Sequence, residues 1–305
     1  MFKKKSVYIT LCLFLVTMGV NAQQLDIQLI EALTERTQLA PESVFKKFRE
    51  AGMKPVNHIL SPNEKEKVAK AFSLLPPLHQ KVLKEHLYSI SFMDNMPNTA
   101  LTSPVEISGP EKMFNITFRA EILKETISEW ATWKENSCYV TSESNEYQVT
   151  IEAGNLEAIV YVLLHEATHV VDAVLNITPH LDDFDALVAP TPFTADIWSE
   201  INKPKEKATS ALLETTRFRS GKPVLISSAP KVYEALKETP FASLYSMASW
   251  HEDLAEMLTI YHLTQKMNQP FKILVKKNGT KVCAYEPFTN KQVVKRQNAL
   301  AKFYE

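Results

Sequence analysis

The sequence has little glycine and no excess of either charge. Glycine contributes 6 of the 305 residues, against 17 prolines, which disfavours glycine-rich phosphate-binding loops and large sandwiches with many tight turns. Lysine and arginine number 34 and aspartate and glutamate 35, so the net charge is −1. This balance offers no electrostatic footprint for nucleic acid or an anionic membrane surface. With 45% hydrophobic residues, the chain is long enough to bury a sizeable core, and we expect a helix-rich globular protein.

Long apolar runs are also scarce, and the clearest one has the pattern of an export signal at residues 1–22. Lysines at 3–5 precede an apolar run at 7–20, and Ala22 ends a group of small residues that suits a signal peptidase. The run is shorter than the roughly 20 residues of a membrane span, and we expect no later stretch to cross a bilayer. The sequence therefore predicts an exported chain, periplasmic or secreted, without stable membrane insertion after cleavage. An uncleaved anchor is the alternative.

Cysteine is the third scarce residue, with three in the chain. Cys12 lies in the expected signal, which leaves Cys138 and Cys283 in the mature protein. Two cysteines in an oxidising compartment suggest one disulfide. Two separate buried thiols are the alternative.

Hydrophobic periodicity changes at residue 88. It predicts a helical N-terminal region at 23–87 and an α+β domain at 88–305 that ends in a hairpin and a short helix, so the fold class is helix-rich α+β. Helices are expected at about 41–52, 62–72, 78–87, 121–135, 156–175, 231–248 and 250–267, strands at 88–92, 114–118 and 147–151, and a hairpin at 273–285 around Asn278-Gly279.

One motif with chemical meaning lies in the helix predicted at 156–175. Residues 165–169 read His-Glu-Ala-Thr-His. Two histidines four residues apart project from the same helix face, as two nitrogen ligands of Zn²⁺ require. Glu166 lies beside the first histidine, where its carboxylate can reach a metal-bound water. Two satisfied core histidines are the alternative, so the decisive question is whether a third ligand exists.

A second motif supplies a candidate about 80 residues downstream, where residues 250–256 read WHEDLAE at the start of an amphipathic helix. His-Glu-x-x-His followed by Glu-Asp-x-Ala-Glu resembles the gluzincin group of zinc metallopeptidases. The motifs are most similar to those of the catalytic domain of the anthrax lethal factor group. In that group Asp follows the second His by three residues, as Asp172 follows His169, and Tyr precedes the ligand Glu by seven, as Tyr245 precedes Glu252. The resemblance covers about residues 88–267.

The resemblance implies a zincin-like domain and a site for one zinc ion. The ligands that it implies are His165, His169 and Glu252, with an open fourth position of the kind that catalytic zinc keeps. It also implies that Glu166 is the general base and later the proton donor to the leaving amine. Tyr245 is then the hydrogen-bond donor to the oxyanion.

Two acids are expected to support these ligands. Glu256, one turn after Glu252, would accept a hydrogen bond from the outer nitrogen of His165, and Asp172 would be a second supporting residue on the ligand face. A solvated helix acid is the alternative for Glu256. Capping or local pairing is the alternative for Asp172, which is also an alternative third ligand in place of Glu252. His251 should point about 100° away from Glu252 around the helix, so we do not include it among the ligands.

The sequence thus predicts an exported zinc-dependent peptidase that acts on peptide or protein substrates. We expect an extended substrate to pair with a strand at the rim of the cleft, at 114–120 or 147–151. Two alternatives stay open. The chain could be a catalytically inactive exported protein that keeps the zinc site for binding or stability, or an adhesion protein in which the motif match is accidental.

Overall fold

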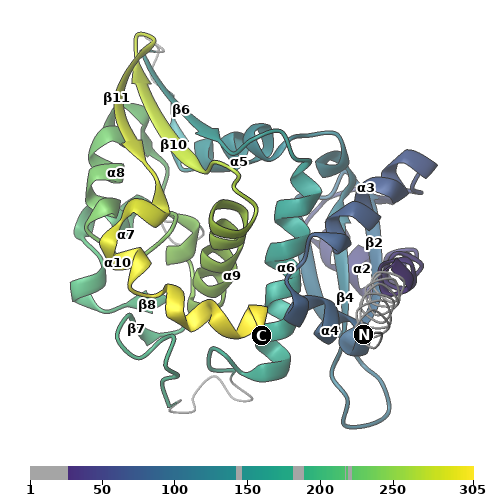
Figure 1. Cartoon of the computed structure of the whole chain (residues 1–305). Coiled ribbons are helices and arrows are strands. Elements are labelled where there is room, and N and C mark those ends of the chain that lie inside the picture. Colours follow the sequence, from purple (N-terminus) through teal and green to yellow (C-terminus); the bar gives the residue numbers. More distant parts are fainter. Residues whose placement is uncertain (1–26, 142–145, 181–188, 217, 219–221) are drawn as a thin grey trace, which may run out of the picture.

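The computed structural model describes residues 27–141, 146–180, 189–216, 218 and 222–305, and the export signal expected at 1–22 lies outside these residues. The described elements mix helices and strands, which confirms the α+β class (Figure 1). The α-helices are α2 (Glu42–Glu50), α3 (Pro62–Ser73), α4 (Pro77–His86), α5 (Ile127–Asn136), α6 (Ala158–Leu175), α7 (Ala211–Thr216), α8 (Ala229–Lys237), α9 (Trp250–Tyr261) and α10 (Lys291–Val294). The strands are β1 (Val56–Asn57), β2 (Leu87–Asp94), β3 (Ala100–Val105), β4 (Met113–Arg119), β5 (Tyr139–Val140), β6 (Tyr147–Glu152), β7 (Trp198–Glu200), β8 (Lys203–Pro204), β9 (Val224–Leu225), β10 (Lys272–Lys277) and β11 (Thr280–Tyr285).

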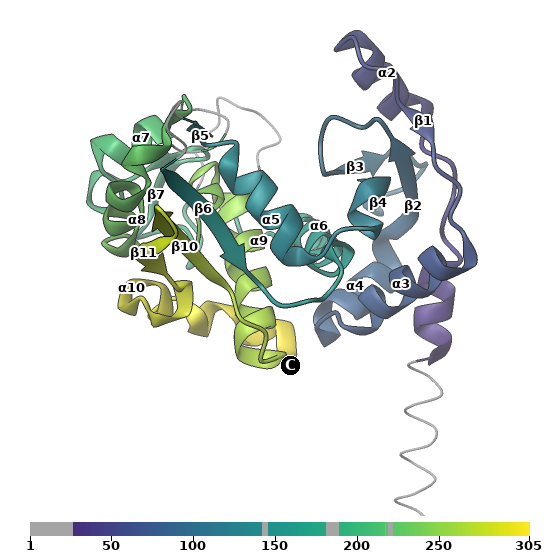
Figure 2. The same cartoon turned by 90° about the horizontal axis from the view of Figure 1, so that it is seen from above.

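Two sheets lie on opposite sides of helix α6 (Figure 2). The first has the order β1-β2-β4-β3, in which β2 and β4 are parallel and β3 is an antiparallel edge strand. The second has the order β11-β10-β6 and is antiparallel throughout. Strand β4 is therefore paired on both sides, whereas β3 has a strand partner on only one side among the described residues. This edge strand packs beside α6.

The N-terminal region is part of the same structure rather than a separate helical unit. It contains strand β1, which pairs with β2, and its helices α3 and α4 pack against α6. Leu33, Phe72 and Leu83 belong to the same buried cluster as Tyr161 and Phe303. The boundary expected at residue 87 therefore does not separate two hydrophobic cores.

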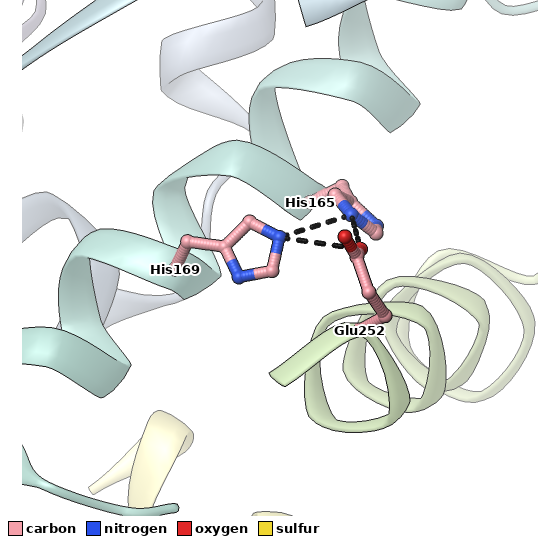
Figure 3. A group of neighbouring side chains, drawn as sticks. All are labelled: His165, His169 and Glu252. Atoms are coloured by element: carbon pink, nitrogen blue, oxygen red, sulfur yellow. Dashed lines mark hydrogen bonds and ion pairs between the residues drawn. The ribbon is translucent and has the colours of Figure 1, made fainter. Parts of the chain in front are cut away.

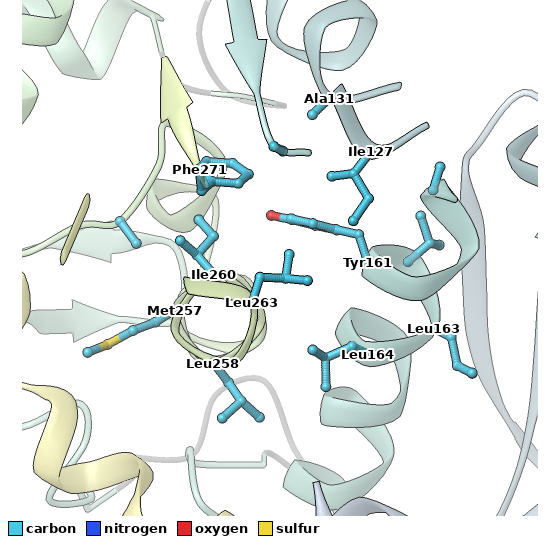
Figure 4. Close-up of a cluster of buried hydrophobic side chains, with 14 of the residues drawn as sticks. Ile127, Ala131, Tyr161, Leu163, Leu164, Met257, Leu258, Ile260, Leu263 and Phe271 are labelled. Atoms are coloured by element: carbon cyan, nitrogen blue, oxygen red, sulfur yellow. The ribbon is translucent and has the colours of Figure 1, made fainter. Parts of the chain in front are cut away.

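Helix α6 forms the centre of this shared core. It is long and apolar enough to cross a membrane, contrary to our expectation from the sequence, but 78% of its 18 residues are buried inside the protein. Figure 4 shows Tyr161 and Leu164 facing the side chains of α9, and the ring of Tyr161 stacks on Phe271 with centroids 6.1 Å apart. Asn176, in the left-handed conformation with φ 48°, ends the helix. Helices α3, α4, α5 and α9 pack against α6, whereas Glu166 and His169 keep part of their surface exposed.

Several local predictions are confirmed. Ser61 and Glu64 form the reciprocal capping box at the start of α3. The hairpin of β10 and β11 turns at Asn278 and Gly279, whose φ angles of 49° and 78° suit a two-residue turn of the primed type. The helix predicted at 250–267 is present as α9 followed by a single stretch of π-helix to Lys266.

Other local predictions are wrong where proline intervenes. The helix expected at 231–248 ends at Lys237, because Pro240 follows and cannot continue it. Tyr245 consequently lies in a short 3₁₀ turn instead of a long helix. Strand β3 was not predicted, since it contains Pro104, which only an edge strand tolerates.

Candidate metal centre

Helix α6 brings the two histidines of the motif together. His165 and His169 are one turn apart, and their Nε2 atoms lie 3.2 Å from each other (Figure 3). His165 is buried and His169 is partly exposed. Both side chains therefore point to one spot beside the helix, as the four-residue spacing predicts.

Helix α9 brings Glu252 to the same spot. The Ser249 hydroxyl accepts a hydrogen bond from the Glu252 backbone N–H, which starts the helix and places Glu252 in its first turn. Glu252 Oε2 lies 3.0 Å from His165 Nε2 and 3.4 Å from His169 Nε2. Two zinc ligands at bond lengths of about 2.0–2.1 Å and tetrahedral angles are about 3.3 Å apart, so the three atoms have the spacing of one face of a zinc site.

The charges of the three groups are coupled. Burial disfavours the imidazolium of His165, but hydrogen bonds to Glu252 and Glu256 outweigh it and raise the pKa of His165 to about 9. Burial likewise opposes the ionisation of Glu252, yet hydrogen bonds from His165 and His169 hold the pKa of its carboxyl well below the usual value. A metal ion held by these residues would replace a proton of His165 and would compensate the charge of Glu252 in its place.

Glu256 lies behind His165, as expected. Its Oε1 atom is 3.3 Å from His165 Nδ1 and accepts a hydrogen bond from the Tyr161 hydroxyl at 2.8 Å. Ser243 donates to Oε2 at 2.6 Å, and Lys134 Nζ lies 3.2 Å from Oε1. Burial raises the pKa of this carboxyl, but the charge of Lys134, the contact with His165 and the hydrogen bond from Ser243 lower it to about 2. Glu256 is thus an anion that can hold the proton of His165 on Nδ1 and leave Nε2 to a metal.

Glu166 and Tyr245 lie near the donor atoms of His165, His169 and Glu252. Glu166 Oε2 accepts a hydrogen bond from the Thr102 hydroxyl on the edge strand β3 at 2.6 Å. Tyr245 stacks on the imidazole of His165, with ring centroids 5.7 Å apart and an interplanar angle of 23°. Both residues line the same cleft as the two histidines. The structure therefore brings together the base and the phenol that the sequence predicts.

Asp172 makes its contacts with nearby residues, which is the alternative to a supporting role at the histidines of the motif. It belongs to a second group with His180 and His251, and its Oδ2 atom lies 2.9 Å from His251 Nδ1 and 3.2 Å from His180 Nε2. Its carboxylate also accepts two hydrogen bonds from Thr178. Burial raises the pKa of Asp172, but these partners more than compensate and hold it well below its usual value. Asp172 therefore neither supports the histidines of the motif nor replaces Glu252 as third ligand.

The second group has donor atoms close enough for a metal ion, but its carboxylate is already engaged in hydrogen bonds within the protein. Asp172 accepts hydrogen bonds from both the backbone N–H and the hydroxyl of Thr178. The indole N–H of Trp250 lies 3.1 Å from both His251 Nε2 and the carbonyl oxygen of Pro179. These contacts favour the group of His165, His169 and Glu252 as the metal site.

The two cysteines do not form the expected disulfide. Cys138 and Cys283 are both free and buried. Cys138 follows helix α5, whereas Cys283 lies on β11 and its thiol donates to Glu234 at 3.2 Å. Burial raises the pKa of both thiols. The alternative of two separate thiols is therefore correct, and neither thiol is activated as a nucleophile.

A cleft of about 660 Å³ opens over the group of His165, His169 and Glu252, called the metal group below because it could hold a metal ion. Its walls come from β3 and the segment before it, from α5, and from α6 and α9. Sequence reasoning missed Thr102 and Lys134, two of the lining residues that contact the site. No motif marks them, because tertiary packing alone brings β3 and α5 to this place. No family model, curated protein or solved structure matches the chain.

Proposed function

We propose that this chain is an exported zinc-dependent peptidase of the gluzincin type, similar in its site to the anthrax lethal factor group. The observation that carries the proposal is the convergence of His165, His169 and Glu252 within 3.4 Å of one another, with Glu166 in the same cleft. Two imidazoles and one carboxylate are a ligand set of catalytic zinc, which leaves a position open to solvent and substrate. A bound zinc ion polarises a carbonyl and lowers the pKa of a water molecule.

The proposal gives a role to each of four further residues near the metal group. Glu166 takes a proton from the attacking water and passes it to the leaving amine, while Thr102 holds its carboxylate in place. Tyr245 donates a hydrogen bond to the oxyanion that forms at the scissile carbonyl. Glu256 fixes the orientation of His165 from behind. Zinc rather than another divalent metal is proposed because nitrogen ligands in tetrahedral spacing favour it.

The substrate strand in this proposal is not one of the two strands expected from the sequence. Strand β4 is paired on both sides and has no free edge, and β6 belongs to the other sheet and does not line the cleft. Strand β3 is an edge strand, and its residues at 100–102 and Pro104 line the cleft next to Glu166. An extended peptide can therefore add to β3 and pass the metal group with its backbone held.

The proposal is tested by incubating the chain, purified without chelators, with a complex peptide mixture and identifying new termini by mass spectrometry. We expect cleavage that stops when a zinc chelator is added and returns with excess zinc, because the proposed chemistry depends on the ion. A zinc-loaded chain that cleaves nothing would instead support a zinc-binding protein without catalysis. Cleavage that persists in the chelator would contradict the proposal.

A further inference from the structure

Lys134 occupies an unusual place for a lysine. It lies on α5, outside the two ligand helices, and its side chain reaches into the cleft with only 18% of its surface exposed. Its Nζ atom is 3.7 Å from the ring centroid of Tyr245, and three more rings lie within 6.0 Å of it. These rings belong to Trp130, Phe218 and Tyr161. Aromatic faces attract a cation, so the ammonium group is held in this aromatic enclosure.

The same ammonium group also contacts the acid behind the metal group. Lys134 Nζ lies 3.2 Å from Glu256 Oε1, which in turn is 3.3 Å from His165 Nδ1. Tyr245 stacks on the ring of the same histidine, His165. Lys134 is thus in contact with both neighbours of His165, the carboxylate and the phenol ring.

The positive charge of Lys134 compensates a negative charge of the site. Glu166, Glu252 and Glu256 bring three carboxylates to the metal group, and a divalent ion compensates two of them. The third, Glu256, is buried, with a side chain only 2% exposed. A buried carboxylate is costly without a partner of opposite charge, and Lys134 is the cation that lies against it.

The geometry assigns Lys134 the role of a positioning residue that orients Glu256 and Tyr245 together. Its ammonium group fixes the carboxylate that orients His165, and it fixes the ring that presents the proposed oxyanion donor. Metal binding and the reaction are therefore both expected to depend on one lysine that is not itself a proposed metal ligand. The second half of this inference depends on the proposed function, whereas the effect on metal binding does not.

The test compares Lys134→Met, which keeps the length of the side chain, with Lys134→Arg, which keeps the charge. Zinc affinity is measured by competition with a chromophoric chelator, and kcat and KM are measured on a peptide that the wild type cleaves. We expect Lys134→Met to weaken zinc binding by up to about 10–100-fold, which is the cost of losing an outer partner of a ligand, because Lys134 acts through such a partner, Glu256. We expect kcat to fall further than KM rises, and Lys134→Arg to restore most of the zinc affinity.

Two comparisons separate this role from general effects of charge or folding. Lys47→Met removes another lysine that lines the cleft and should leave the zinc affinity unchanged. In a Glu256→Gln background, Lys134→Met should weaken zinc binding little further, because the two residues act through one contact. If Lys134→Met does not fold, Lys134→Gln takes its place in both measurements.

The results distinguish this inference from the proposed function. Unchanged zinc affinity in a folded Lys134→Met chain would overturn the role of Lys134, as would equal losses in Lys134→Met and Lys134→Arg. A chain that binds zinc and cleaves no peptide would overturn the peptidase proposal, and the effect of Lys134 on zinc affinity would still be measurable.

Discussion

Replacing Glu166 by Gln is expected to leave zinc bound and to reduce peptide hydrolysis by at least about a thousandfold. Glutamine keeps the shape of the side chain and can still contact Thr102, but it cannot take a proton from water. General base catalysis contributes about 10²–10⁴-fold, and the same group is also the proposed proton donor to the leaving amine. The measurement is kcat/KM on a cleaved peptide, together with the zinc content of the variant.

A matched control for this variant is Glu157→Gln. Glu157 is the residue before helix α6 and lies near Lys67, away from the cleft. The change removes a carboxylate next to the N-terminus of the same helix and should leave kcat/KM unchanged. Full activity in Glu166→Gln would show that another group is the base, and loss of zinc from this variant would show that Glu166 is a ligand.

The second large effect is expected at Glu252. Glu252→Ala removes one of three proposed protein ligands, so zinc affinity should fall by more than the roughly 10–100-fold that an outer partner costs. Hydrolysis should be lost with the metal. Metal analysis after dialysis against a weak chelator and an activity assay measure the two losses on the same sample.

Asp172→Asn is the comparison that decides whether Asp172 or Glu252 is the third ligand. Asp172 lies 2.9 Å from His251 and outside the group of His165, His169 and Glu252. Asp172→Asn should therefore keep zinc at the stoichiometry of the wild type, even if the loss of a buried ionised partner lowers the stability of the chain. The opposite pattern, with zinc lost in Asp172→Asn and kept in Glu252→Ala, would assign the third ligand to Asp172.

Local sequence signals were sufficient for the parts of the site that lie on single helices. The spacing of His165 and His169 fixes their relative position because both are on α6, and the start of α9 follows from Ser249 and its capping hydrogen bond. The resemblance to a peptidase group then pointed to Glu252. These predictions needed no knowledge of how α6 and α9 cross.

Side chains between elements could not be predicted in the same way. Asp172 is three residues after His169, a rise of about 4.5 Å along a helix, which is enough to carry it past the metal group to Thr178 and His251. His251 lines the same cleft as Glu252, but its Nδ1 atom contacts Asp172. Hydrophobic periodicity predicts which face of a helix a residue occupies. It does not predict which residue of another element that side chain contacts.

Strand β3 and helix α5 illustrate a different limit. Because strand β3 contains Pro104, neither alternation nor strand propensity indicates a strand there. An edge strand tolerates a proline because one of its sides makes no ladder hydrogen bonds. Lys134 is an ordinary helix lysine by sequence. Its place between Glu256 and Tyr245 arises only when α5 packs against α6.

The central claim is that one zinc ion, held by His165, His169 and Glu252, is required for peptide hydrolysis. Its most direct test is to strip the chain of metal and titrate it with zinc while following cleavage of a susceptible peptide. The account predicts no cleavage at the start, a linear rise, and a break at about one zinc per chain. Cleavage by the stripped chain, or a rise that does not depend on Glu252, would contradict it.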